Sequence, residues 1–136
     1  MYNIYKETAL SGAAEVITVQ QPATGGKCVQ FKTLTLYALA AATFTLERDG
    51  TGATTTALTV IAKGGAPTPA FTAFNSSNVG SGTVLEAFTL VAGQTMVVDL
   101  AGYRLCGDGI GKNFTVRTNS LSTTVRICIK ADEIPL

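Results

Sequence analysis

The feature that most constrains the fold of this chain is a series of short β-branched and aromatic runs, separated by Gly, Pro, Asn and Asp at fairly regular intervals. Such spacing is typical of an all-β sandwich or barrel. One run, Glu15–Gln20, ends at the breaker Pro22–Gly26. Another, Thr83–Leu90, ends at Ala92–Gln94. Pro cannot donate to a strand ladder and Gly adopts turn conformations freely, so these breakers predict strand ends.

The whole pattern predicts about eight strands, the number found in a jelly roll. We therefore expect an all-β fold, a jelly-roll-like antiparallel β-sandwich. A seven-stranded immunoglobulin-like sandwich is the rival, but the chain has no Trp and therefore no Cys-Trp-Cys constellation. The clearest runs are 15–20, 28–38, 44–48, 54–62, 71–74, 83–90, 95–100, 113–118 and 123–130.

Alternation within the runs predicts which side chains face the core. In the last run, Val125, Ile127 and Ile129 share one face. In Cys28–Ala38, Val29 and Phe31 have one parity, whereas Leu34 and Leu36 have the other. Side chains change face at every residue of a strand, so this switch predicts a β-bulge or a strand that passes from one buried face to another.

A chain of 136 residues suits one domain. We expect a single β-sandwich domain over residues 13–136, preceded by an N-terminal arm or edge strand over residues 1–12. Tyr2, Ile4 and Tyr5 put three large side chains before the first Gly. They are a possible interface if the segment reaches onto a neighbouring chain, and part of this domain's own packing if it does not.

Charged residues make up only 14% of the chain, against roughly 25% in an average soluble domain. Large parts of the surface must therefore be Thr, Ser, Gly, Ala and Gln. With a net charge of +1, little electrostatic repulsion opposes association, so we expect partner proteins that cover this surface. The basic residues are scattered rather than clustered, which disfavours binding to nucleic acid.

Histidine is absent, which excludes Ser-His-Asp, Cys-His and His-metal sites. A glycosidase needs a pair of facing carboxylates. The candidates Glu15, Glu47, Glu86 and Asp99 show no spacing that singles out such a pair. We therefore expect no catalytic residues, no cofactor and no metal.

The three cysteines, Cys28, Cys106 and Cys128, are odd in number and widely spaced, so we expect small buried thiols. No uninterrupted apolar stretch reaches the roughly 18 residues of a membrane span. The first ten residues carry Lys6 and Glu7 and do not resemble a signal peptide. We expect the chain to fold in the cytoplasm.

A ligand-binding role would use the long breaker segments. Lys63–Pro69 and Asn75–Gly82 are rich in Gly, Pro, Ser and Asn, and both predict loops at an end of the sandwich. The candidate ligand-loop residues are Lys63, Pro67, Asn75 and Asn78.

Three segments carry a resemblance to a known group: Ser11–Pro22, Phe44–Gly50 and Leu90–Thr95. They resemble small β-sandwich virion structural proteins of tailed bacteriophages, such as head decoration (cement) proteins. The resemblance implies a non-enzymatic capsid decoration protein that folds in the host cytoplasm and then joins the virion. Its partners would be the major capsid or other virion proteins and further copies of itself, as a homo-oligomer such as a trimer. The alternative within the group is a neck, tail or fibre domain that binds a receptor or sugar.

Overall fold

The structure, a computed structural model, describes residues 1–20, 26–48, 56–76, 82–106 and 113–135. Within these ranges the chain forms strands and turns, without a helix. None of the described segments is therefore a helix that could cross a membrane. The predicted all-β class is confirmed.

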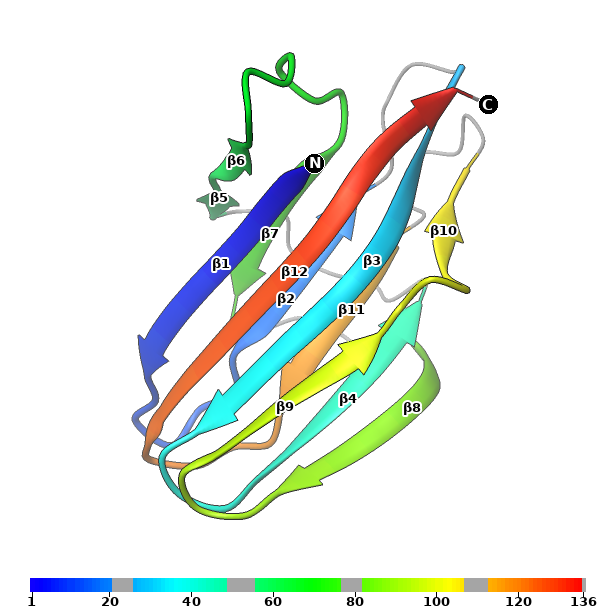
Figure 1. The fold of residues 1–136 in the computed structure, drawn as a ribbon. Helices are drawn as coiled ribbons and strands as arrows, with labels where there is room; N and C mark the ends of the chain where they lie inside the picture. The colour runs from blue at the N-terminus through cyan, green and yellow to red at the C-terminus, as the bar shows by residue number, and fades with distance from the viewer. Residues whose placement is uncertain (21–25, 49–55, 77–81, 107–112, 136) are drawn as a thin grey trace.

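The strands form two six-stranded sheets that lie face to face (Figure 1). Every described ladder is antiparallel. Sheet A has the order β10-β3-β12-β1-β6, with β9 also paired to β3, and contains β1 (Tyr2–Ala9), β3 (Lys27–Ala38), β6 (Val60–Ala62), β9 (Gln94–Asp99), β10 (Arg104–Leu105) and β12 (Thr124–Pro135). Sheet B has the order β5-β7-β2-β11-β4-β8 and contains β2 (Val16–Gln20), β4 (Ala42–Arg48), β5 (Ala57–Leu58), β7 (Thr72–Ser76), β8 (Thr83–Leu90) and β11 (Asn113–Thr118).

The core lies between the sheets, on the faces that alternation predicts. Val125, Ile127 and Ile129 of β12 are buried, as expected. Phe31 of sheet A stacks on Phe114 of sheet B with ring centroids 4.3 Å apart, which joins the two layers. Each large apolar side chain buried in this way stabilises the fold by roughly 1.5–3 kcal/mol.

The predicted change of face in β3 is confirmed. The pairing of β3 with β12 shifts register between Lys130 and Ala131, which leaves Lys32 as an extra residue in β3. As a result Val29 and Phe31, before the bulge, and Leu34 and Leu36, after it, all point into the core with 0% exposure. The bulge lets one long strand bury side chains of both parities.

The prediction of one continuous strand over 54–62 is wrong within residues 56–62, the part of this run that the structure describes. β5 pairs with β7 in sheet B, whereas β6 pairs with β1 in sheet A, so the chain crosses between the sheets at Thr59. Leu58 and Val60 still pack against the same core, one from each sheet. Leu58 and Val60 have the same parity in the sequence, so their spacing resembles one face of a single strand.

The first strand is integrated into this domain. β1 pairs with β12 over its whole length and with β6 through Tyr2, Asn3 and Ile4. Leu10 N then donates to Thr123 O at 2.7 Å. Residues 1–12 thus lie along sheet A and do not project as an arm. β1 is an edge strand only beyond Ile4, where it no longer pairs with β6.

Candidate interaction surface

The outward face of sheet A carries an uncharged row of side chains that crosses four strands. Ladder pairing aligns Tyr5 with Cys128, Cys128 with Thr35, and Thr35 with Val97. Tyr5 is 45% exposed and Val97 is 67% exposed. These residues lie opposite in parity to the core residues of the same strands, so the row points away from the sandwich. We call Tyr5, Cys128, Thr35 and Val97 the uncharged row.

The charges beside the uncharged row are paired. Arg126 Nε donates to Glu7 Oε2, and this hydrogen bond raises the pKa of Arg126. The Arg126 guanidinium also lies 4.8 Å from the centroid of the Tyr37 ring. The Tyr5 hydroxyl donates to Glu7 Oε2 at 3.3 Å. A partner that covered this part of the face would meet charges that already neutralise one another.

On the other side of the uncharged row, the face mixes polar and apolar groups. Pairing aligns Asn3, Lys130, Thr33 and Asp99 across the sheet, and Ile61 of β6 lies opposite Asn3. Ile61 is 51% exposed. Within the described residues, the buried Asn3 Oδ1 atom has no hydrogen-bond partner. This corner therefore combines an exposed apolar side chain with an unsatisfied acceptor.

Cys128 is a half-buried thiol in the centre of the face. Its burial raises the thiol pKa, which lowers the fraction of reactive thiolate. It therefore contributes a small apolar surface to the uncharged row, as the sequence predicts for a cysteine of this chain.

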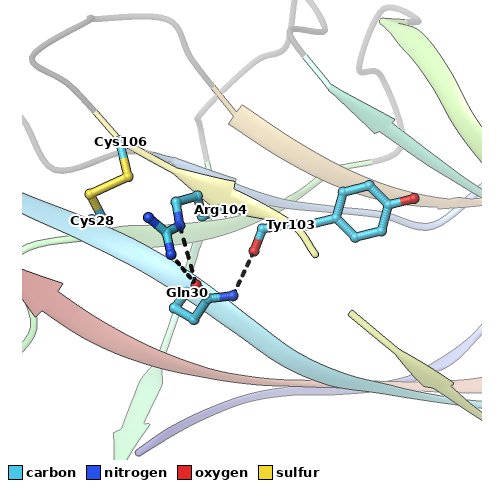
Figure 2. The surroundings of a disulfide bond; sticks show 5 residues. All are labelled: Cys28, Gln30, Tyr103, Arg104 and Cys106. Atoms are coloured by element: carbon cyan, nitrogen blue, oxygen red, sulfur yellow. Dashed lines mark hydrogen bonds between the residues drawn. A yellow bond between two sulfur atoms is a disulfide. The ribbon is translucent and has the colours of Figure 1, made fainter. Parts of the chain in front are cut away.

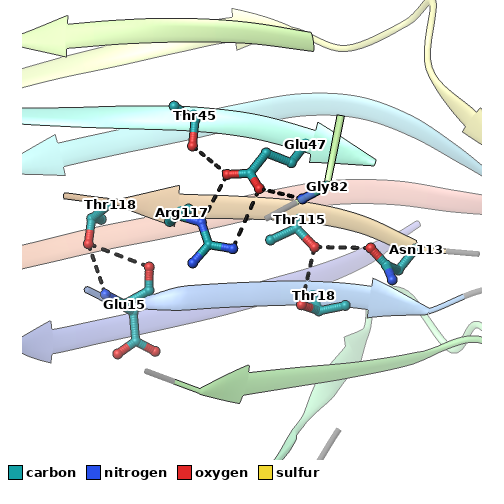
Figure 3. Close-up of polar contacts among 9 residues, drawn as sticks. All are labelled: Glu15, Thr18, Thr45, Glu47, Gly82, Asn113, Thr115, Arg117 and Thr118. Carbon is teal, nitrogen blue, oxygen red and sulfur yellow. Dashed lines mark hydrogen bonds and ion pairs between the residues drawn. The ribbon is translucent and has the colours of Figure 1, made fainter. Parts of the chain in front are cut away.

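The outward face of sheet B is different because its polar side chains are buried. Thr18, Asn113 and Thr115 are at most 7% exposed, and Glu47 is 2% exposed. Figure 3 shows them joined in networks along β2, β11 and β4. The Thr18 and Thr115 hydroxyls lie 3.3 Å apart, and Thr115 Oγ1 donates to Asn113 Oδ1 at 3.1 Å. These groups are satisfied within the chain and do not offer a polar binding site.

Glu47 is held by several donors in this network (Figure 3). Its carboxylate accepts from Arg117 Nε at 2.9 Å, from Thr45 Oγ1 at 2.7 Å and from the Gly82 amide at 3.0 Å. Burial alone would raise the pKa of Glu47, but these hydrogen bonds outweigh it, and the pKa is lowered. The Gly82 contact fastens the start of β8 to β4.

The other candidate carboxylates lie on different elements from Glu47. Glu15 accepts from Asn75 Nδ2 at 3.2 Å, and burial raises its pKa. Glu86 and Asp99 are exposed, on β8 of sheet B and β9 of sheet A. Within the described part of the chain, no cluster of three or more Cys, Asp or Glu residues has a geometry that could hold a metal.

The structure separates the three N-terminal interface candidates. Tyr2 is 4% exposed, packs edge-on against Phe71 and donates from its hydroxyl to Pro67 O at 2.7 Å. Ile4 is 0% exposed. Both side chains belong to this chain's own core, which is the second of the two alternatives for this segment. Of the three, Tyr5 alone is exposed on the surface.

Among the candidate ligand-loop residues that the structure describes, Pro67 lines a cavity of about 380 Å³ together with Tyr2, Lys27 and Glu133, among others. Lys63 and Pro67 are exposed, and Lys63 N donates to Met1 O at 3.0 Å. Asn75 belongs to β7, and its side chain donates a hydrogen bond to Glu15. Asn78 lies outside the described residues.

Another cavity, of about 310 Å³, lies near these loops. Its lining is mainly apolar and includes Leu58, Pro69, Phe71 and Phe74. Such a lining does not match the hydroxyl groups of a sugar.

The structure corrects the expectation of three free thiols. Cys28 of β3 and Cys106, just after β10, form a disulfide across 78 positions of sequence (Figure 2). Beside it Arg104 donates to Gln30 Oε1 from Nε at 3.2 Å and from an Nη atom at 3.1 Å. Gln30 Nε2 donates to Tyr103 O at 3.2 Å. No pattern in the sequence predicts this pairing, because β10 is only two residues long.

The disulfide holds β10 on the same edge of β3 that β9 occupies further along. A further cavity, of about 320 Å³, lies next to it and is lined by Arg48, Leu85, Tyr103, Arg104 and Phe114, among others. Arg104 is already bonded to Gln30, so this cavity does not present a free cluster of cations.

Comparisons with protein-family models, with curated proteins and with solved structures find no match to this chain.

Proposed function

We propose that this chain is a non-enzymatic structural protein that works by assembly, and that the assembly is a virion in which it serves as a capsid decoration or cement protein. The uncharged row on sheet A is the observation that carries the assembly role. It presents exposed Tyr5 and Val97 with Cys128 and Thr35 between them. The resemblance of Ser11–Pro22 and Phe44–Gly50 to tailed-phage virion proteins supports the choice of a virion.

The chemistry of the described residues supports a binding role over catalysis. The buried carboxylates Glu15 and Glu47 are each used in hydrogen bonds that hold strands together. The exposed face of sheet A offers apolar contact area and paired charges instead of a cleft. Contacts of this kind stabilise a capsid by burying surface between neighbouring subunits.

The size of the face indicates how much more surface an assembly contact needs. Five strands spaced about 4.8 Å apart, with about six residues along each, give an area of roughly 400–500 Å². A standard protein interface buries about 800 Å² on each partner. A stable contact must therefore extend beyond this face, onto an adjoining edge or a second partner.

Incorporation of variants into particles tests the proposal. Thr35→Lys places a charge in the centre of the uncharged row, and Thr72→Lys places the same charge on an exposed position of β7 in sheet B. We expect the first variant to be lost from purified particles, whereas the second is incorporated like the wild type. Equal incorporation of both variants, or absence of the wild-type chain from particles, would contradict the proposal.

A further inference from the structure

The edge strand β9 differs from the other edges that the structure describes. Natural proteins protect sheet edges with short strands, bulges, Pro or Lys. The edge strands β5, β6 and β10 have two or three residues, and the pairing of β8 with β4 contains a register shift. Beyond Ile4, where β1 becomes an edge, that strand carries Lys6. β9 has six residues, Gln94–Asp99, contains neither Lys nor Pro, and pairs with β3 in uninterrupted register. This edge is therefore open to pairing with another strand.

The backbone groups that face the open edge can be assigned from the ladder. Leu100 N donates to Lys32 O at 2.8 Å, in the same register that pairs Asp99 with Thr33. Hydrogen-bonded pairs alternate along an antiparallel ladder, so Val98 and Met96 also direct their N–H and C=O groups toward β3. The N–H and C=O groups of Thr95, Val97 and Asp99 therefore point to the open side.

The opposite side of β3 gives an independent check. Leu39 N donates to Thr124 O at 2.9 Å, in the register that pairs Ala38 with Val125. By the same alternation, the backbones of Thr35 and Tyr37 bond to β12, and those of Leu34 and Leu36 bond to β9. Both observations assign the same backbone groups to the β3–β9 ladder.

We propose that β9 pairs antiparallel with β9 of a second copy of this chain, about a two-fold axis at Val97. Val97 then lies opposite Val97 of the second copy, and Thr95 lies opposite Asp99 of the second copy on each side of the axis. Each of these pairs exchanges two backbone hydrogen bonds, which uses all three outward-directed residues. This contact rests on the assembly role proposed above and specifies one surface of it.

Side-chain chemistry fits this register. The Thr95 hydroxyl meets the Asp99 carboxylate of the other copy, and hydroxyl-to-carboxylate hydrogen bonds are among the stronger ones. Asp99 Oδ1 already accepts from Ala101 N at 2.9 Å, which holds the carboxylate in place. The two Asp99 carboxylates stay about 14 Å apart, four residues along the strand direction, where salt screens their repulsion.

The same register also extends the uncharged row. The row ends at Val97, and pairing on the axis continues it into Val97, Thr35, Cys128 and Tyr5 of the second copy. The outward faces of the two sheets then form one surface of roughly 800–1,000 Å², twice the single face and close to what a standard interface needs on one partner. The dimer would thus create the assembly surface that one copy lacks.

Sedimentation velocity of the purified full-length chain over a range of concentrations tests the contact. Val97→Lys places two like charges opposite each other on the axis, and Val91→Lys is its matched control because Val91 is 66% exposed and Val97 is 67% exposed. We expect a concentration-dependent dimer that Val97→Lys weakens about threefold or more, because like charges directly opposite each other in paired strands are destabilising. The dimer of Val91→Lys should match that of the wild type.

A charge rescue tests the register and does not depend on Val97. Thr95→Asp places two carboxylates opposite each other and should weaken the dimer. The double variant Thr95→Asp, Asp99→Lys restores an Asp–Lys pair across the axis and should recover it. Within one chain the two positions are too far apart to pair, so recovery can come only from the other copy.

This contact is overturned by a wild-type chain that stays monomeric, by equal weakening in both lysine variants, or by no recovery in the double variant. A dimer that none of the variants affects would also overturn it while leaving the assembly role intact, because the copies would then meet through another surface. Failure of the assembly role is recognised separately, by absence of the chain from particles.

Discussion

Arg117 and Glu47 form an ion pair on the outward face of sheet B, with 2.9 Å between Nε and Oε2, and the Glu47 side chain is only 2% exposed. Arg117 lies on β11 and Glu47 on the neighbouring strand β4. The Glu47 carboxylate also accepts a hydrogen bond from the amide of Gly82, just before β8. It therefore joins three separate strands of the chain.

Glu47→Gln should destabilise the fold by about 2 kcal/mol, because it replaces a charge-assisted hydrogen-bond set by a neutral one and leaves Arg117 without its counter-ion. Urea unfolding at neutral pH measures this change. Glu86→Gln, at an exposed glutamate of β8, is the control and should change the free energy of unfolding by less than about 0.5 kcal/mol. Equal effects of the two substitutions would show that the pair does not stabilise the fold.

The contribution of Glu15 to stability should depend on pH in the opposite sense to that of Glu47. Its pKa is raised by burial, so the folded state favours the protonated form and loses stability as pH rises from the ordinary glutamate value through the raised one. Glu15→Gln should therefore gain stability over the wild type as pH rises through that window. The pKa of Glu47 is lowered, so its contribution is present above the ordinary value and disappears as pH falls through the lowered one.

Urea titrations of wild type, Glu15→Gln and Glu47→Gln at mildly acidic and neutral pH compare the two carboxylates. The difference between Glu15→Gln and wild type should grow toward neutral pH. If that difference is the same at both pH values, Glu15 does not have a raised pKa in the folded chain.

Reduction of the disulfide should lower stability substantially. The Cys28–Cys106 bond closes a loop of 78 positions, and a bond of this kind stabilises a fold by about 2–4 kcal/mol. We expect a lower melting temperature in reducing buffer, and the same lower value for the Cys28→Ser, Cys106→Ser double variant in either buffer. Cys128→Ser is the control and should keep the full response to reductant. A wild-type chain that melts identically in both buffers would contradict the pairing.

Asn3→Val should stabilise the isolated chain by about 1 kcal/mol, because it removes a buried oxygen that has no hydrogen-bond partner in the described structure. Valine also suits the middle of a strand. Thermal unfolding measures the change. A melting temperature that is unchanged or lower would show that the Asn3 oxygen has a hydrogen-bond partner in solution.

Local alternation was enough to predict the all-β class, the core face of β12, and the bulge in β3. Alternation failed within residues 56–62, because parity does not reveal that a chain has crossed from one sheet to the other at Thr59. Alternation could not predict whether Tyr2 and Ile4 pack in the core or at an interface, because the same residue types are buried in both.

The candidate surface depended on information that the sequence does not hold. Tyr5, Cys128, Thr35 and Val97 come from four separate strands and meet only through their ladder pairing. The pairing of Cys28 with Cys106 likewise requires β10 to lie on β3. Scarcity of charge gave a reason to expect partner proteins, but it could not say which face they would cover.

Electron cryo-microscopy of virions purified from cells that express this chain tests the central claim most directly, because it shows whether the chain is bound and which surface of the sandwich meets its neighbours. The assembly account predicts that the chain lies on the capsid with the uncharged row of sheet A covered by a neighbouring subunit. A chain bound to the particle with this row open to solvent, and with its contacts made through sheet B alone, would contradict the account.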